Sequence, residues 1–257
     1  MNRRKNIRLG ISIAGAMLLL LFADAFPVAW TDMTKEEFDG EMQKTSQFYT
    51  VNQHYSVQVD YASFRGYDSE IPYDQSTGYY RKDGKSYHNF LLGIHTIQNS
   101  RYKVIVDTAK KAILVADPEN EESAAEMKQL NFDNESKYVT AYKSAPSGGG
   151  KLLRVEFNKI PAYTAYTIDI SDDGRLRGMT IYYRESYPLD PSDPSSAKAQ
   201  PKLKITYSAF DAGKTFDSKK EFDTSKYFTE ADGKLTLTAA FKNYTITDLR
   251  IPTKKKS

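Results

Sequence analysis

The sequence predicts a mainly β fold, an antiparallel sheet of roughly eleven to thirteen strands accompanied by two helices. The chain has 19 Tyr and 13 Phe, residue types that suit a pleated, half-buried surface. Apolar and polar residues alternate with a period of two in many short segments, and Gly, Asp or Pro residues separate these segments. The sequence does not repeat with a period of about 20 to 50 residues, which disfavours a propeller or a solenoid.

The first 25 residues have the pattern of a secretory signal peptide. Four basic residues precede an apolar run at 9–23: Arg3, Arg4, Lys5 and Arg8. The run ends at Ala23-Asp24-Ala25, which fits the small side chains that signal peptidase requires at two of these positions. We therefore expect cleavage after Ala25 and export to the periplasm.

An uncleaved membrane anchor is the alternative for the same segment. Such an anchor needs about 20 continuous apolar residues, and Asp24 and Pro27 interrupt the run before that length. The chain has no Cys, so a lipid-modified N-terminal Cys and disulfides are excluded. In the cleaved form the protein is peripheral to the membrane at most.

Removal of the signal leaves a protein without net charge. The whole chain has 36 Lys and Arg against 33 Asp and Glu. Residues 1–25 hold four of these basic residues and one acidic residue, so 32 of each remain. A balanced surface has no general field for nucleic acid, and we expect no nucleic-acid partner. The basic tail Lys254-Lys255-Lys256 is typical of a solvated chain end.

Two segments of the mature chain have helical patterns. Thr34 and Glu37 make a capping box in the segment 31–47, where Phe38 and Met42 lie on one face. The segment 118–130 begins with Pro118 and an acidic first turn, as helices commonly do. We expect both helices to cover the sheet.

The longest strand is predicted directly after the first helix. Tyr49, Val51, Tyr55, Val57, Val59 and Tyr61 share one face, and only Gln53 breaks the alternation. Asp83-Gly84 separates two Tyr-containing strands at 78–82 and 85–91 and predicts a type I′ hairpin. Shorter strands are predicted at 94–98, 102–107, 112–116, 137–143, 151–157, 163–170, 176–185, 202–210, 226–229, 234–238 and 244–249. The segment 187–201 has four Pro and is predicted as an exposed loop.

Motifs of catalysis and of metal binding are missing from the sequence. There is no Gly-x-Ser-x-Gly, phosphate loop or His-Glu-x-x-His, and no Cys nucleophile. The three His residues, His54, His88 and His95, have no metal-ligand spacing, although the last two could converge across adjacent strands. The paired carboxylates Asp172-Asp173 and Asp190 with Asp193 lie in turn-forming sequences. We expect neither an enzyme nor a metal or cofactor site.

Several segments, taken in order, resemble the LolA/RseB family of periplasmic proteins. They are the helix at 31–47, the hairpin residues Gly78-Tyr79-Tyr80-Arg81-Lys82 and Asp83-Gly84-Lys85, the segment 111–118 leading into a helix, the segment 168–180 with Ile168-Asp169-Ile170-Ser171-Asp172-Asp173-Gly174-Arg175-Leu176, and 203–210. The resemblance implies an antiparallel half-open β-barrel of about eleven strands, covered by two or three helices. It covers 31–212 as the barrel core. Residues 213–257 are then a C-terminal strand extension and basic tail within a single β-rich domain, 26–257.

Two functions follow from the resemblance and from the surplus of apolar strand face. The first is the binding or carrying of an apolar ligand, such as a lipid or a lipoprotein acyl chain. The expected cavity face comprises Tyr55, Val57, Val59, Tyr61, Leu203, Ile205 and Tyr207. The second is a non-catalytic scaffold or subunit of a cell-envelope complex, in which the Pro-rich loop contacts a protein partner. On strand pattern alone, an ordinary packed core is the other reading of the same face.

Overall fold

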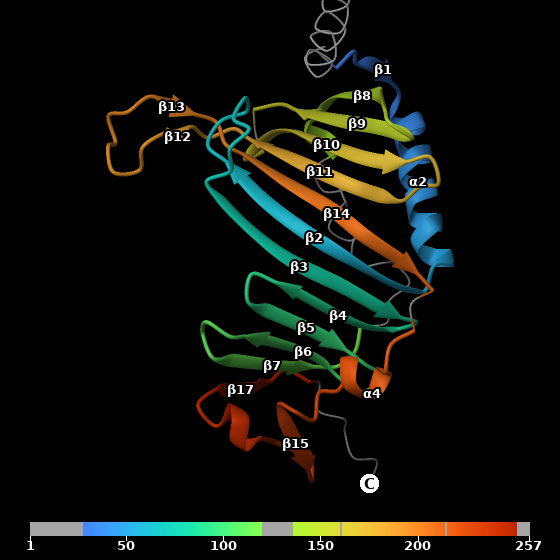
Figure 1. The fold of residues 1–257 in the computed structure, drawn as a ribbon, viewed down its shortest axis with the longest axis vertical. Helices are drawn as coiled ribbons and strands as arrows, with labels where there is room; N and C mark the ends of the chain where they lie inside the picture. The colour runs from blue at the N-terminus through green and yellow to red at the C-terminus, as the bar shows by residue number, and fades with distance from the viewer. Residues whose placement is uncertain (1–27, 120–135, 160, 214, 251–257) are drawn as a thin grey trace, which may run out of the picture.

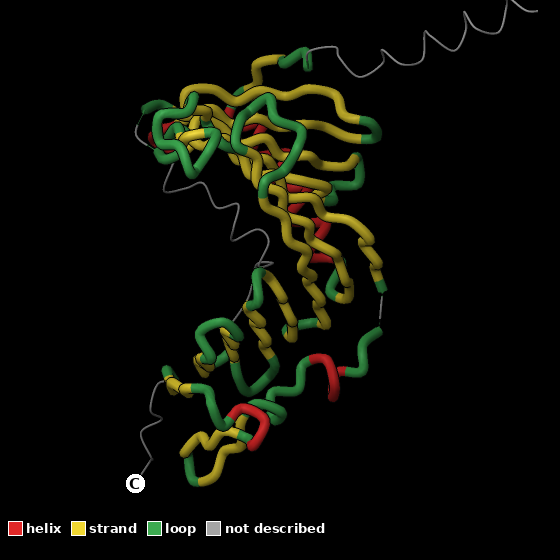
Figure 2. The backbone as a smooth tube through the Cα atoms, turned by 60° about the vertical axis from the view of Figure 1, so that its left-hand side comes forward, coloured by secondary structure: helices red, strands yellow, loops and turns green. Residues whose placement is uncertain are grey.

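The computed structural model describes residues 28–119, 136–159, 161–213 and 215–250. It contains 17 strands, and 13 of them form one sheet in the order β1-β8-β9-β10-β11-β14-β2-β3-β4-β5-β6-β7-β17. The sheet is curved into an upper and a lower limb (Figure 2). Within the described residues its edge strands β1 and β17 pair with different neighbours and not with each other, so the sheet is not closed into a barrel.

The strands of the first half are β1 (Thr31–Met33), β2 (His54–Phe64), β3 (Asp74–Asp83), β4 (Ser86–Leu91), β5 (Ile94–Gln98), β6 (Lys103–Asp107) and β7 (Ala112–Ala116). The second half has a short 3-10 helix (Ser136–Tyr138), β8 (Val139–Ser147), β9 (Gly150–Phe157), β10 (Tyr163–Ser171), β11 (Leu176–Tyr183) and β14 (Lys202–Ala212). The remaining short elements are β12 (Tyr187–Pro188), β13 (Lys198–Ala199), α4 (Ser218–Glu221), β15 (Phe228–Ala231), β16 (Lys234–Leu237), a second 3-10 helix (Ala239–Phe241) and β17 (Thr245–Asp248).

Helix α2 (Lys35–Val51) begins at the predicted capping box and ends four residues later than expected. The Thr34 hydroxyl accepts from the Glu37 N–H at 3.2 Å, and the Glu37 carboxylate accepts from the Thr34 N–H at 2.7 Å. The helix continues through Tyr49 and Val51, so the prediction of a strand starting at Tyr49 was wrong. Asn52 ends it, because both its backbone N–H and its side-chain amide donate to the Phe48 carbonyl.

The hairpin between β3 and β4 forms where the sequence predicts it, but its turn is shifted by one residue. Asp83 pairs with Ser86, so the two loop residues are Gly84 and Lys85. Only Gly84 has a positive φ, at 59°. A single positive φ at the first loop position fits a type II′ turn and not the predicted type I′ turn.

Helix α2 covers one face of the sheet, from β8 to β4. Its Phe38 and Tyr49 belong to a core that includes Tyr55, Val57, Leu153, Val155, Ile168 and Leu176. The Phe38 ring lies 4.9 Å from that of Tyr142, and the Phe48 ring lies 5.5 Å from that of Phe210. The helix therefore runs across the strands of the upper limb, as Figure 1 shows.

The C-terminal segment packs on the opposite face, at β5 to β7. Ile97, Val104, Val106, Ile113 and Val115 form a second core with Phe222, Tyr227 and Phe228. His88 lies on this face, since it pairs with Ile97, whereas its neighbour Tyr87 belongs to the α2 core. β17 pairs with β7 in parallel, Thr245 beside Ala112, although the other pairs in the sheet are antiparallel.

The Pro-rich segment is an exposed loop, as predicted, and two short strands close it at its base. Its strands β12 and β13 pair Tyr187 with Ala199 and Pro188 with Lys198. This hairpin, residues 187–199, extends away from the sheet in Figure 1, and we call it the arm. The predicted signal at 1–25, the predicted helix at 118–130 beyond Glu119, and the basic tail lie outside the described residues.

Candidate ligand-binding site

All seven residues of the expected cavity face lie on the α2 side of two paired strands, β2 and β14. Ile205 is opposite Tyr61, Tyr207 is opposite Val59, and Leu203 is opposite Ser63. Directly opposed residues of an antiparallel pair point to the same face. Tyr55 and Val57 continue this face along β2, and all seven belong to or pack against the α2 core.

The structure divides these residues into a filled end and a half-buried end. Tyr55 is 0% exposed, and its ring packs between those of Tyr49, Tyr80 and Phe210 at centroid distances of 5.3–5.8 Å. Val57, Val59 and Ile205 are also buried, at 3%, 6% and 7%. Helix α2 and Phe210 therefore occupy the space above this end, which is a packed core.

Towards the other end of the face, Tyr61 and Leu203 are only half-buried. Tyr207 is half-buried as well, but it lies opposite Val59, at the border of the filled end. On the neighbouring strand β11, Ile181 lies directly opposite Leu203 and is half-buried as well. Burial raises the pKa of the Tyr61 phenol, so this hydroxyl lies in a poorly solvated environment. The apolar face thus reaches beyond the helix that covers its other end.

The structure adds Ile181 and Tyr183 to the residues expected from the sequence. Tyr183 is paired with Tyr163 across β10 and β11, and burial raises the pKa of its phenol. The signal for both residues was present, since Met179, Ile181 and Tyr183 alternate in the predicted strand. Their proximity to Leu203 depends on the pairing of β11 with β14, which alternation alone does not give.

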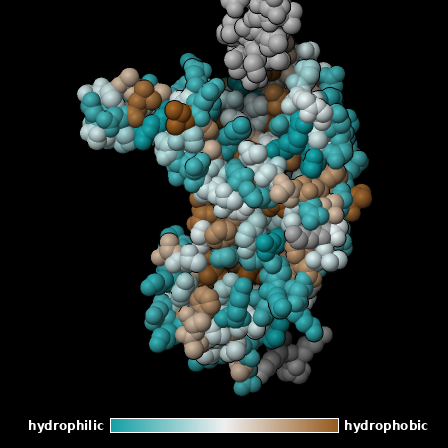
Figure 3. All heavy atoms as spheres, viewed as in Figure 1, coloured by the Kyte–Doolittle hydropathy of each residue, from teal (hydrophilic) through white to brown (hydrophobic). Residues whose placement is uncertain are grey.

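A pocket of about 630 Å³ opens at the half-buried end, under the base of the arm. Leu203 and Tyr183 line it from the sheet, Tyr187 and Pro188 from the arm, and Tyr73 from the loop after β2. Hydrophobic residues are visible on the arm and around the indentation below it in Figure 3. The pocket therefore joins the apolar face to the surface beside the arm.

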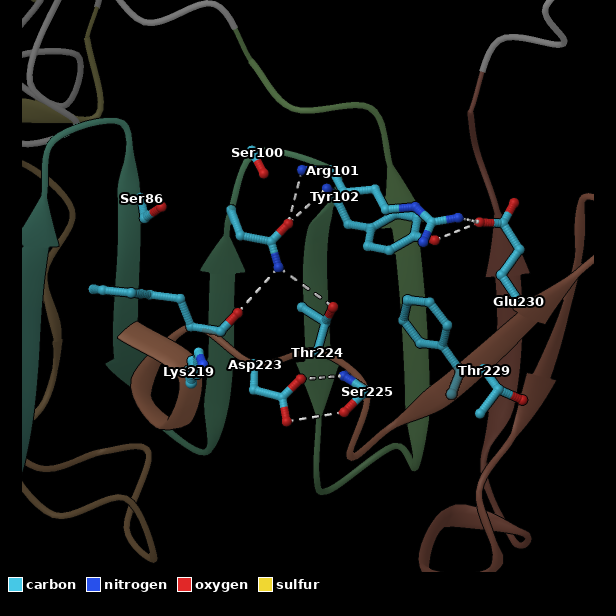
Figure 4. A pocket seen from close by; sticks show the side chains of 13 residues that line it. Ser86, Ser100, Arg101, Tyr102, Lys219, Asp223, Thr224, Ser225, Thr229 and Glu230 are labelled. Atoms are coloured by element: carbon cyan, nitrogen blue, oxygen red, sulfur yellow. Dashed lines mark hydrogen bonds and ion pairs between the residues drawn. The ribbon is translucent and has the colours of Figure 1, made fainter. Parts of the chain in front are cut away.

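A second pocket, of about 760 Å³, lies between the β5–β6 turn and the C-terminal segment (Figure 4). Its polar groups bond to one another. The Asn99 amide donates to the Phe222 carbonyl at 3.0 Å and to the Thr224 hydroxyl at 3.4 Å. Arg101 and Glu230 form an ion pair at 2.5 Å. These bonds join the C-terminal segment to the sheet, so we interpret the pocket as part of that packing seam.

A partly buried polar cluster lies next to this seam, on the face of the C-terminal segment. Glu221 accepts from Arg81 at 2.8 and 2.9 Å and bonds to Nδ1 of His88 at 2.8 Å. Nε2 of His88 lies 3.0 Å from Nδ1 of His95, so these two His residues do converge. Within the described ranges, no group of three or more His, Cys, Asp or Glu has a metal-binding arrangement.

Three of the four paired carboxylates found in the sequence bond to residues of their own turns. Asp173 accepts from the Ser171 hydroxyl and from the Arg175 N–H, and the first of these bonds is the main cause of its lowered pKa. Asp190 and Asp193 accept from the Ser residues two positions later, which lowers both of their pKa values. Such Asx turns explain why Asp occupies these positions, and no catalytic role is needed to account for them.

The comparisons with known proteins give structural similarities alone. No family model matches the sequence, and no curated protein matches it. The similar solved structures include a LolA superfamily protein. The LolA superfamily protein from Nitrosomonas europaea has 12% identity and a TM-score of 0.23, and covers 73% of this chain and 97% of its own.

Two further solved structures are similar over comparable lengths. Lipoprotein LppX from Mycobacterium tuberculosis has 14% identity and a TM-score of 0.33, with 72% of this chain and 100% of the other covered. A domain from Vibrio parahaemolyticus described as a putative outer membrane lipoprotein-sorting protein has 11% identity and a TM-score of 0.26, with 70% and 93% covered. TM-scores this low carry no functional argument, so the proposed function rests on the residues of this chain. Among the described residues, no helix has both the length and the apolar character needed to cross a membrane.

Proposed function

We propose that this protein binds an apolar ligand, a lipid or the acyl chain of a lipoprotein, on the α2 side of β2, β14 and β11. The observation that carries the proposal is the division of one apolar face into a filled end and a half-buried end that leads to a pocket. Tyr61, Leu203, Tyr207 and Ile181 would contact the ligand. The filled end, with Tyr55, Val57, Val59 and Ile205, would support the site as its packed base.

The proposal includes export to the periplasm, cleavage of the signal peptide after Ala25, and ligand binding in the periplasm. It needs no catalytic group and no cofactor, because removal of each buried CH₂ from water contributes about 0.8 kcal/mol. Full burial of about ten carbons would contribute about 8 kcal/mol, which lies within the range of about 4–15 kcal/mol that association costs, so the proposal requires a long and largely buried chain. A binding role explains why an apolar strand face extends past the helix that covers it.

The test is lipid binding by the protein purified from the cell envelope. Native mass spectrometry would detect co-purified lipid, and a fluorescent fatty acyl probe would measure affinity. Leu203→Glu places a charge on the half-buried face and should weaken probe binding at least tenfold. Lys204→Glu is the matched control, because Lys204 is the next residue of β14 and is exposed on the opposite face.

The expected result is probe binding by the wild-type protein and by the control variant, with loss in Leu203→Glu alone. Circular dichroism would establish that both variants are folded. Absence of both co-purified lipid and probe binding in the wild-type protein would contradict the proposal. Equal affinity of the two variants would show that the probe binds elsewhere.

A scaffold role is the second candidate, and exposed apolar residues favour it. Tyr187 and Leu189 of the arm are 51% and 44% exposed, and Ile71 and Tyr73 of the loop after β2 are 83% and 53% exposed. A protein partner would bury these side chains. The variant Tyr187→Ser/Leu189→Ser should then lose a crosslinked envelope partner, whereas Val51→Ser, at an apolar position on α2 that is 80% exposed, should keep it.

A further inference from the structure

The pocket under the arm contains a cation that has no carboxylate partner. Arg65 lines the pocket, and its guanidinium lies 4.8 Å from the ring centroid of Tyr73. Among the described residues no Asp or Glu lies within ion-pair distance of Arg65. An Arg side chain stays protonated at any physiological pH. The pocket therefore carries a fixed positive charge at a wall made by an aromatic ring.

A second cation, Lys202, lies at the same end of the sheet and also lines the pocket. Its ammonium donates to the Tyr67 carbonyl at 2.6 Å and lies 4.9 Å from the Phe64 ring. Burial lowers the pKa of Lys202, and the charges of Asp68 and Glu70 only partly oppose this effect. Lys202 is thus held by a neutral acceptor, and the carboxylates of Asp68 and Glu70 act on its charge without a direct ion pair.

The carboxylates near this end of the molecule do not cancel the two cations. Arg65 contributes to the lowered pKa of Asp190, but Asp190 is at the surface of the arm and its carboxylate bonds to Ser192. Asp68 and Glu70 are exposed on the loop after β2. Charges in solvent are screened by salt within about 10 Å.

The remaining walls of the pocket are apolar. Pro188, Pro191 and Pro201 line it and have no backbone N–H to donate. Tyr183 and Leu203 connect it to the half-buried apolar face of β11 and β14. The pocket thus offers a cation, and the apolar face next to it offers a hydrocarbon-like surface. An amphiphile with an anionic head could contact both.

We infer that the pocket binds the head of an anionic amphiphile, a carboxylate or phosphate group that Arg65 contacts, while the alkyl chain passes Leu203 onto the apolar face. The inference rests on the proposed function, since it names the chemical class of the ligand of that same site. A neutral lipid of equal chain length would lack the contact with Arg65. Selectivity for an anionic head is therefore the property that this pocket adds.

The test compares three probes on the protein as purified from the envelope: a fluorescent 16-carbon fatty acid, its methyl ester, and hexadecyl phosphate as a competitor. Arg65→Gln should weaken binding of the acid about ten- to a hundredfold, the usual range for loss of a hydrogen bond to a charged group. It should leave the ester within about twofold. Arg65→Lys keeps the charge and should retain most of the affinity. Lys204→Gln is the control cation on the opposite face.

The outcomes separate this inference from the proposed function. One outcome is that the acid and the ester bind the wild-type protein equally, and that Arg65→Gln changes the affinity for both by the same factor or not at all. That result would refute the inferred selectivity for an anionic head group and would leave the proposed apolar binding intact. If neither probe binds, the proposed function itself is wrong. Displacement of the acid by inorganic phosphate alone as strongly as by hexadecyl phosphate would show a site for a free anion and would also overturn the inference. If hexadecyl phosphate binds more tightly than the acid, the natural head group is a phosphate, and if the acid binds more tightly, it is a carboxylate. Either result supports the inference.

Discussion

The buried imidazole of His88 should make the stability of this protein depend on pH. Its side chain is 5% exposed and lies between the sheet and the C-terminal segment. Burial lowers the pKa of His88 to about 4, although the bond to Glu221 acts in the opposite direction. An unfolded His titrates near 6.5. Between these two values the unfolded chain binds a proton that the folded protein does not.

The sign and the size of the effect follow from this difference. The stabilisation from neutral His88 is complete above about pH 6.5 and is lost as the pH falls towards 4. At pH 5 the loss is about 2 kcal/mol, because each pKa unit corresponds to about 1.4 kcal/mol. The pKa of His95 is also lowered by burial and adds to the same slope. Glu221 contributes only at lower pH, because its pKa is lowered by Arg81 and His88 against the effect of burial.

The measurement is urea unfolding of the wild-type protein and of His88→Gln at pH 7.5, 6.5, 5.5 and 5.0. The free energy of unfolding of the wild-type protein should fall more steeply with decreasing pH, by about 2 kcal/mol in total, than that of the variant. His54→Gln is the matched control, since it removes a His whose side chain is 57% exposed. Identical slopes for wild type and His88→Gln would refute the reasoning, whatever the absolute stability of the variant.

Three further substitutions test the packing. Gly78→Ala should destabilise the protein by more than about 2 kcal/mol, because the added Cβ would lie 2.2 Å from the Phe90 carbonyl oxygen and the strands must move apart. Phe228→Ala should cost about 3–5 kcal/mol, since Phe228 is 2% exposed in the second core and packs against Tyr102. Thr34→Ala should cost about 1 kcal/mol through loss of the α2 cap. All three are measured as changes in the free energy of unfolding in urea.

Each of these substitutions has a control at a position without the contact. Gly40→Ala on α2 meets no atom within 4 Å and should stabilise the helix by roughly 0.5–1 kcal/mol. Leu249→Ala, at a side chain 56% exposed, should change stability by less than about 0.5 kcal/mol. Thr50→Ala removes an exposed hydroxyl inside the helix and should not destabilise. A core or cap variant that matches its control would contradict the packing described for that position.

Local patterns in the sequence were sufficient for most strands and for the start of α2. The strands at Ile94–Gln98 and Ala112–Ala116 agree with the predicted ranges residue for residue. The end of α2 was missed because Tyr49 and Val51 happen to continue the period of two found in β2. The break at Gln53 was the physical signal, since its amide donates to the carbonyls of Tyr49 and Thr50 at the helix end.

Contacts between distant segments could not be predicted in this way. The parallel pairing of Thr245 with Ala112 and the burial of Phe222 against β5 to β7 join residues more than 100 positions apart, and no local period encodes them. The same limit applies to the site. Alternation placed Leu203 and Tyr61 on one face. No sequence pattern pointed to Arg65, because its place in the pocket depends on the position of the arm and of the loop after β2.

The arm joins the sheet at two adjacent points. The Tyr183 N–H donates to the Pro201 carbonyl at 3.0 Å, so the ladder between β11 and β14 is already closed where the arm begins and ends. The length and composition of residues 187–199 can therefore change without a shift in strand register. Because Tyr187 and Pro188 also form a wall of the pocket, exchange of this hairpin is a route by which ligand selectivity could diverge, in evolution or by engineering, on an unchanged sheet.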